Sequence, residues 1–226
     1  MNNKYIDLTH PLTSQVPTWN GSCGFHVDIK KDYDREFRVQ QIKMHAGIGT
    51  HMDAPSHRFQ GAPSIADIPL ESCIVPAICM DVSNKAHADY EVTLDDIHEF
   101  ESAYGSIMAG TLVIVHTGWW RFWGEPTKYR NEDAHKKMHF PAVSHAAAEK
   151  LLARGIVGLA IDTLSPDCRD TTFPVHQILL GSGKYIIENV SDPTKLPPCG
   201  GSVIALPIRA VDCTEAPIRL VGVILD

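Results

Sequence analysis

The chain has 226 residues, of which 44% are hydrophobic, and it carries a formal net charge of −7. This length and hydrophobic content suffice for one large core, so we expect a single domain over residues 1–226. The negative charge is spread without long blocks of like charge, which argues against nucleic acid or an anionic membrane surface as the main partner.

The N-terminal region shows no targeting signal. Residues 1–7 lack the apolar centre of a secretory signal and lead directly into strand-like sequence. No apolar run approaches the roughly 20 residues needed to cross a bilayer, and the six cysteines form no C-x-x-C pair. We therefore expect a cytoplasmic protein with free thiols and no membrane partner.

Short apolar runs between turn-forming residues predict β-strands along the whole chain. In chain order they cover residues 6–8, 74–80, 111–116, 156–161, 185–188, 203–208 and 218–225. Helical patterns cover residues 94–104, where Thr93 can cap the first turn, and residues 144–154, with a third helix near 175–180. Because the second helix leads directly into a strand, we expect an α/β or α+β fold with helices packed on a mixed sheet.

One segment concentrates residues that bind metal ions. Residues 45–57 read HAGIGTHMDAPSH, and in an extended chain His51 and Asp53 lie on one face, about 7 Å apart at Cα. Imidazole and carboxylate ligands together suit zinc, manganese or iron. Pro55 should end the strand and turn His57 back toward the same space. The segment therefore predicts a metal site that activates water, and the alternative is a set of ordinary histidines near a glycine-rich turn.

Aromatic residues suggest where a substrate binds. Trp19 follows Pro17 in a loop rich in proline and glycine, where it can stack on a flat substrate or pack within the loop. The second group is His116 with Trp119, Trp120 and Trp123, and we expect it mainly to pack internally. It can instead line the pocket or an oligomer contact.

Asp162 ends a predicted buried strand, so it is a candidate to orient a ligand histidine, or else part of a capped turn. His176 and Glu188, taken alone, fit a helix-surface histidine and a strand-end glutamate. No nucleophile elbow, phosphate-binding loop or dinucleotide fingerprint occurs.

The segment Gly49-Thr50-His51-x-Asp53-Ala54-Pro55-x-His57 resembles the signature of the cyclase-like metal-dependent hydrolase family, which includes bacterial kynurenine formamidases and isatin hydrolases. The resemblance continues in order and spacing over nearly the whole chain, through Asp7-Leu8-Thr9, Pro17-x-Trp19, Thr117-Gly118-Trp119, residues 140–144 and 161–163, and Pro174-x-His176 to Glu188.

The resemblance implies a swivelling β/β/α architecture, with a mixed sheet or small barrel flanked by helices, and homodimers or homotetramers. It also implies the site residues. Zn²⁺ or Mn²⁺ would be bound by His51, Asp53, His176 and Glu188, with His57 as the catalytic acid or base and Trp19 as a wall of the substrate pocket.

The sequence departs from the family pattern at one position. A histidine is expected four residues before His51, where this chain has Gly47. Either a bulge over residues 47–49 returns His45 to the metal, or one ligand is absent. A second metal ion is therefore doubtful.

The resemblance predicts hydrolysis of an amide-type C–N bond in a small aromatic substrate, with N-formylkynurenine as the leading candidate. The main alternative is an isatin hydrolase-like enzyme that opens cyclic amides or lactones. A third hypothesis, suggested by Gly47, is a catalytically silent protein that binds a metal or small molecule.

Overall fold

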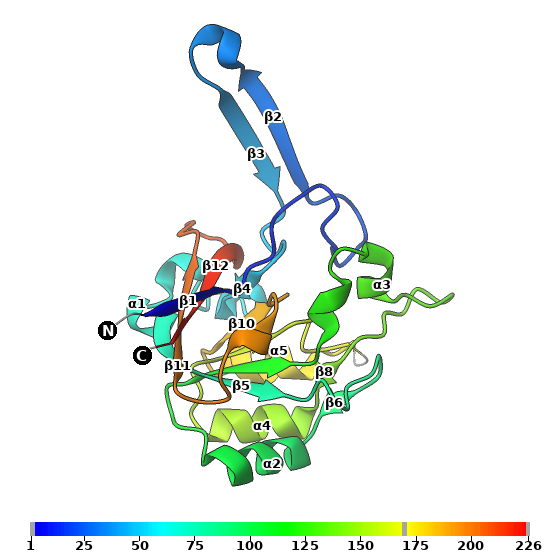
Figure 1. Cartoon of the computed structure of the whole chain (residues 1–226), viewed down its shortest axis with the longest axis vertical. Coiled ribbons are helices and arrows are strands. Elements are labelled where there is room, and N and C mark those ends of the chain that lie inside the picture. The colour runs from blue at the N-terminus through cyan, green and yellow to red at the C-terminus, as the bar shows by residue number, and fades with distance from the viewer. Residues whose placement is uncertain (1–2, 169–170, 225–226) are drawn as a thin grey trace.

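A closed β-barrel forms the centre of the computed structural model, which describes residues 3–168 and 171–224 (Figure 1). The barrel strands follow one another in the order β12-β11-β5-β7-β9-β10-β4, and β4 pairs with β12 to close the sheet. β12 is long enough to pair with β4 near its start and with β1 near its end. The strands of this sheet are β1 (Lys4–Asp7), β4 (His51–Asp53), β5 (Ile74–Asp81), β7 (Leu112–His116), β9 (Gly158–Ile161), β10 (Tyr185–Glu188), β11 (Gly201–Pro207) and β12 (Glu215–Ile224).

The sheet is mixed, as the sequence predicted. The pairs β5–β7, β7–β9 and β9–β10 are parallel, whereas the remaining pairs in this sheet are antiparallel. The α/β class with a small barrel is therefore confirmed. The predicted strands are present with ends shifted by a few residues, except that Leu225, the last residue of the predicted strand 218–225, lies outside the described residues.

The apolar runs of the parallel strands are explained by burial on both faces. In β7, Leu112 and Ile114 point into the barrel core, while Val113 and Val115 pack against the helices. Because successive side chains alternate between faces, a strand covered on both sides must be apolar throughout.

Helices cover the outer face of the parallel strands. α2 and α4 contact each other below β5 in Figure 1, and α4 contacts α5. Thr93 caps α2 as predicted, because its hydroxyl accepts a hydrogen bond from the Asp96 backbone while the Asp96 carboxylate accepts one from the Thr93 backbone. The helices are α1 (Leu70–Cys73), α2 (Leu94–Tyr104), α3 (Pro126–Arg130), α4 (His145–Ala153) and α5 (Pro174–Gly181). Among the described helices, none combines the length and apolar character of a membrane span.

Two further pairs of strands lie outside the barrel. β6 (Glu91–Val92) and β8 (Ala142–Val143) form a short parallel pair. β2 (Phe25–Lys31) and β3 (Val39–Met44) form a hairpin that projects from the body of the molecule (Figure 1). This hairpin was not predicted, although residues 25–29 alternate between apolar and polar side chains.

Candidate metal centre

The short strand β4 places the two central residues of the motif side by side. His51 and Asp53 point to one face, and Met52 between them is buried in the barrel core, as the two-residue period of a strand requires. On the neighbouring strand, Glu188 lies directly opposite His51. Opposite residues of an antiparallel pair share a face, so the Glu188 carboxylate reaches within 3.4 Å of the His51 imidazole.

His176 comes to the same place from the first turn of α5. The Asp167 carboxylate accepts hydrogen bonds from the backbone N–H groups of Val175 and His176, at 3.0 Å each, and so caps the helix. The same carboxylate lies 2.7 Å from His176 Nδ1. Asp167 therefore fixes both the start of the helix and the orientation of the imidazole, which turns Nε2 toward β4 and β10.

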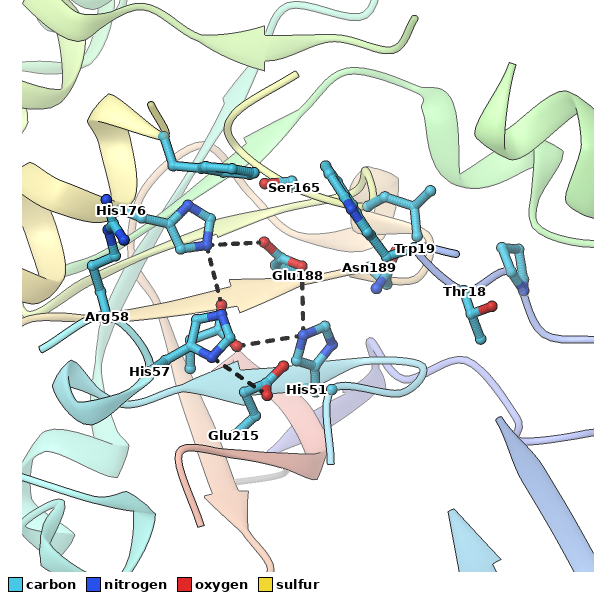
Figure 2. A pocket seen from close by; sticks show the side chains of 15 residues that line it. Thr18, Trp19, His51, His57, Arg58, Ser165, His176, Glu188, Asn189 and Glu215 are labelled. Carbon is cyan, nitrogen blue, oxygen red and sulfur yellow. Dashed lines mark ion pairs between the residues drawn. The ribbon is translucent and has the colours of Figure 1, made fainter. Parts of the chain in front are cut away.

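The donor atoms fit a divalent cation. His51 Nδ1 lies 2.9 Å from the Gly49 carbonyl, and His176 Nδ1 faces Asp167, so each imidazole donates its Nδ1 hydrogen away from the site and keeps Nε2 for it. His51 Nε2 lies 3.4 Å from Asp53 Oδ1, and His176 Nε2 lies 3.5 Å from Asp53 Oδ2 and from Glu188 Oε1 (Figure 2). Donors about 3.4 Å apart match the edges of a tetrahedron round an ion with bonds of about 2.1 Å.

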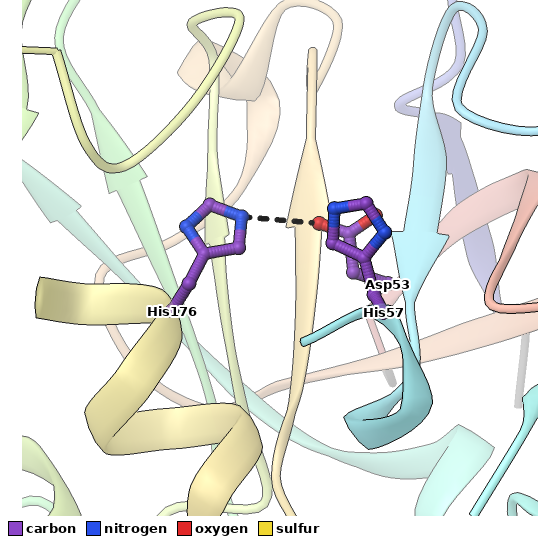
Figure 3. A group of neighbouring side chains, drawn as sticks. All are labelled: Asp53, His57 and His176. Carbon is purple, nitrogen blue, oxygen red and sulfur yellow. Dashed lines mark ion pairs between the residues drawn. The ribbon is translucent and has the colours of Figure 1, made fainter. Parts of the chain in front are cut away.

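One buried carboxylate oxygen of the site would be stabilised by a bound cation. Asp53 Oδ1 is shielded from solvent and accepts no hydrogen bond from any described residue, and a buried carboxylate oxygen without a partner is costly. Two groups of donors meet at Asp53: one with His51 and Glu188, and one with His57 and His176 (Figure 3). The carboxylate therefore connects every metal-binding group that the described residues offer.

The pKa shifts of the two carboxylates also bear on whether the site binds a cation. Burial raises the pKa of Glu188, and the neighbouring Asp53 raises it further. Burial acts in the same direction on Asp53, but the imidazoles around it, His51 first, hold the pKa of Asp53 below its usual value. Two buried carboxylates in contact with the same imidazoles are stabilised by a positive charge between them.

His57 lies where the motif predicted. Pro55 begins a 3-10 helix, Pro55–His57, directly after β4, and it brings the His57 ring to a centroid distance of 6.0 Å from the His176 ring. His57 Nδ1 lies 3.3 Å from Glu215 Oε2. The hydrogen bond to Glu215 is the main reason that the pKa of His57 is raised.

His45 does not reach the site. It is exposed, and its ring lies beside Gly24 near the base of the β2–β3 hairpin. The sequence offered two explanations for glycine in place of the expected histidine at residue 47. The explanation in which a bulge returns His45 to the metal is therefore wrong for this structure. The space beside Gly47 is instead filled by Glu215, a residue that the sequence motifs did not indicate.

A pocket opens over these donors. It has a volume of about 420 Å³, enough for a small aromatic molecule, and it is lined by His51, Asp53, His57, His176, Glu188 and Glu215 together with Trp19, Phe173, Arg58 and others. Trp19 is 45% exposed, and its ring lies 6.0 Å from the Phe173 ring. The expected pocket tryptophan therefore lies beside the donor set, with an aromatic neighbour that sequence reasoning missed.

In the other tryptophan cluster, Trp119 and Trp123 pack internally, as expected. Trp119 is buried with Tyr129 and Phe140, and its indole N–H donates to the Tyr129 carbonyl at 2.8 Å.

The hypothesis that Asp162 orients a ligand histidine is wrong. Its carboxylate accepts hydrogen bonds from the Thr117 backbone at 2.9 Å and from the Thr117 hydroxyl at 2.7 Å, so it holds the loop after β7. Asp167, five residues later in the same polar segment, takes the predicted role because the direction of α5 places His176 over it.

We expect Asp167→Asn to lower metal affinity by about 10- to 100-fold, because loss of a carboxylate that orients a ligand imidazole has this effect in metal sites. The measurement is calorimetric titration of the chelator-treated protein with Zn²⁺ or Mn²⁺. Asp162→Asn is the matched control and should leave the affinity unchanged. Loss of affinity in the control alone would reverse the assignment.

Comparison with known proteins shows what the chain is similar to. The family described as Putative cyclase matches residues 6–168. The chain is 29% identical to an isatin hydrolase of Roseibium aggregatum over 214 residues, covering 88% of this chain and 81% of the relative. It is 27% identical to a kynurenine formamidase of Bacillus cereus over 228 residues, covering 97% of each. The structure superposes on isatin hydrolase A from Labrenzia aggregata with a TM-score of 0.91 and 27% identity, covering 99% of this chain and 94% of the other.

Proposed function

Because this chain belongs to the cyclase family, we propose that it hydrolyses amide-type C–N bonds at the centre formed by β4, α5 and β10. The chain is a metal-dependent hydrolase with relatives named kynurenine formamidase and isatin hydrolase. The observation that carries the proposal is the arrangement of His51 and His176, whose Nε2 atoms both face the paired carboxylates of Asp53 and Glu188.

We assign His51, Asp53, His176 and Glu188 as the metal ligands. Two imidazoles and two carboxylates form a mixed nitrogen and oxygen set, which suits Zn²⁺ or Mn²⁺. When bound, such an ion polarises a carbonyl group and lowers the pKa of water. Asp53 and Glu188 add two buried carboxylates to this set, and carboxylate oxygens are common ligands of divalent cations.

The protein side chains supply binding and proton transfer. The pocket orients the substrate with its carbonyl toward the carboxylates and imidazoles, while Trp19 and Phe173 contact a flat ring. Water adds to the carbonyl carbon and loses one proton to His57, and His57 passes this proton to the departing nitrogen as the C–N bond breaks. His57 is placed for this step because it lines the same pocket and is partly exposed.

We propose N-formylkynurenine as the leading substrate. Its aromatic ring suits the Trp19 wall, and its amino-acid carboxylate suits the Arg58 guanidinium at the edge of the pocket (Figure 2). The second candidate is a cyclic amide such as isatin, which is favoured by the similarity to isatin hydrolases. Isatin has no carboxylate, so Arg58 offers a way to separate the two.

The first experiment is elemental analysis of the purified protein, followed by hydrolysis of N-formylkynurenine and isatin before and after chelation. We expect bound Zn²⁺ or Mn²⁺ and turnover that chelation abolishes and the same ion restores. The faster substrate identifies the reaction. Bound metal without turnover of either substrate would instead favour a metal-binding protein without hydrolytic activity.

Trp19→Ala should raise KM for aromatic substrates by roughly tenfold, because stacking and ring burial contribute about 1 to 2 kcal/mol and 1.4 kcal/mol corresponds to a factor of ten. Steady-state kinetics with an aromatic and an aliphatic formamide measure the effect. The aliphatic KM and the melting temperature should not change. If the aromatic KM is also unchanged, Trp19 only packs within its loop.

We propose that the chain forms a homodimer or homotetramer through the β2–β3 hairpin. Phe25, Val27 and Ile29 share a face with Ile42 and Met44 of the paired strand, whereas His26, Asp28 and Lys43 lie on the other face. Val27 and Ile42 are 42% and 57% exposed. A two-stranded hairpin is marginally stable alone, and an exposed apolar face of this kind indicates an interface.

Charging this apolar face should dissociate the oligomer. In Val27→Glu/Ile42→Glu, two directly paired apolar side chains become carboxylates, and burying them in an interface is unfavourable. Size-exclusion chromatography with light scattering should show a monomer. His26→Gln/Lys43→Gln, the cross-strand pair on the opposite face, is the control and should remain oligomeric. A monomeric wild-type protein would refute the proposal.

A further inference from the structure

The structure leaves no room for a side chain at residue 47, which is a glycine. Its φ is not among the positive values that favour glycine, in contrast to the nearby Gly49 at 62°, so no left-handed backbone conformation requires a glycine at residue 47. A Cβ at this position would lie 2.0 Å from Glu215 Oε1 and 3.0 Å from Glu215 Cδ, its two nearest atoms, and 3.3 Å from His51 Nε2. The Glu215 carboxylate therefore occupies the volume that a side chain at residue 47 would take.

The sheet holds Glu215 in this place. Glu215 begins β12 and lies directly opposite Asp53 of β4, and the Ala54 N–H donates to the Thr214 carbonyl at 2.9 Å. Opposite residues of an antiparallel pair project to the same face. The Glu215 side chain consequently enters the pocket beside the donor set, where it is 24% exposed.

The partner of this carboxylate is His57. Glu215 faces His57 in Figure 2, and Glu215 Oε2 lies 3.3 Å from His57 Nδ1. A carboxylate on Nδ1 keeps the hydrogen there and leaves the lone pair of a neutral imidazole on Nε2. Asp53, His57 and His176 form one of the described donor groups, with ligand atoms within 4.8 Å of one another, whereas Glu215 belongs to no such group.

We propose that Glu215 is the positioning residue for His57 and that Gly47 is present to make room for it. The proposal rests on the proposed function, which assigns proton transfer to His57. On this basis, the glycine in place of the expected histidine is not simply a lost ligand. The vacated volume holds a carboxylate that acts on the catalytic imidazole.

A double-mutant cycle tests the link between the two positions. We expect Glu215→Ala to lower kcat by at least about tenfold, because a mispositioned general acid loses much of its contribution, while KM and metal content stay unchanged. Gly47→Ala should lower kcat in the same direction by displacing the carboxylate, and its metal content is measured as well because the new Cβ would also lie 3.3 Å from His51 Nε2. The double variant should be no slower than Glu215→Ala alone, since residues that act through one contact are not additive.

A spectroscopic readout separates positioning from packing. Long-range ¹H–¹⁵N correlation spectra of the Zn²⁺-loaded protein report which imidazole nitrogen of His57 carries the hydrogen. We expect Nδ1 in the wild type, a change in Glu215→Ala, and partial return in Glu215→Gln, whose amide oxygen still accepts a hydrogen bond. Glu149→Ala is the matched control, because His145 Nε2 lies 3.3 Å from Glu149 on the surface of α4.

Two results would overturn the proposal. Loss of bound metal in both Glu215 variants would make Glu215 a ligand, and an unchanged His57 spectrum with unchanged kcat would make it a packing residue. If the wild type hydrolyses neither substrate, the proposed function fails, but the spectra still decide whether Glu215 orients His57.

Discussion

Replacing Asp53 by alanine should abolish metal binding and lower kcat/KM by roughly 10³-fold or more. Asp53 is the residue shared by both donor groups, and its Oδ1 is the buried oxygen without a hydrogen-bond partner. A catalytic ion contributes several kcal/mol to transition-state stabilisation, and each 1.36 kcal/mol is a factor of ten in rate. The measurements are metal content by elemental analysis and kcat/KM for the faster substrate.

Thermal unfolding adds a readout that does not depend on turnover. At 100 times its Kd, a ligand stabilises the folded state by about 2.7 kcal/mol, which corresponds to a rise of about 5–10 °C in Tm for a chain of this length. Wild type should show this shift on adding the metal, and Asp53→Ala should not. Asp81→Ala, which removes another carboxylate paired with a histidine, His116, should keep the shift. A full metal-dependent shift in Asp53→Ala would contradict the assigned site.

The parts of the fold that follow from local patterns could be predicted from the sequence. The four-residue apolar run of β7 is buried on both faces, and the Thr93 cap sets the start of α2, so both have signals within a few residues. Closure of the barrel has no such signal. It depends on β4 pairing with β12, which is more than 160 residues away in the chain.

The same distinction between local and long-range signals explains which site residues could be predicted from the sequence. His51, Asp53 and His57 lie within seven residues, and strand geometry with Pro55 brings them together. Asp167 was missed in favour of Asp162 because both follow a buried strand, and only the direction of α5 selects between them. Glu215 has no motif at all. It belongs to the site through its register opposite Asp53, a long-range property of the sheet.

His57→Ala should separate chemistry from metal binding. We expect kcat to fall by about 10²- to 10⁴-fold, the usual contribution of a general acid or base, while metal content and the metal-dependent rise in Tm remain. KM should change little, because the aromatic walls Trp19 and Phe173 are untouched. The control is His139→Ala, since His139 also pairs with carboxylates but does not line the pocket.

The metal content of His57→Ala decides whether His57 is a metal ligand or the acid–base residue. His57 lies in a donor group with Asp53 and His176, so a ligand role would make the variant lose affinity as Asp53→Ala does. The contact with Glu215 favours the acid–base role, because it engages Nδ1 and leaves Nε2 for proton transfer. If His57 donates the proton, His57→Ala should retain its metal and lose much of its kcat for a substrate with a poor nitrogen leaving group. The loss of kcat should be smaller for a substrate whose leaving group needs no protonation. An equal loss for both kinds of leaving group would show that His57 does not donate the proton.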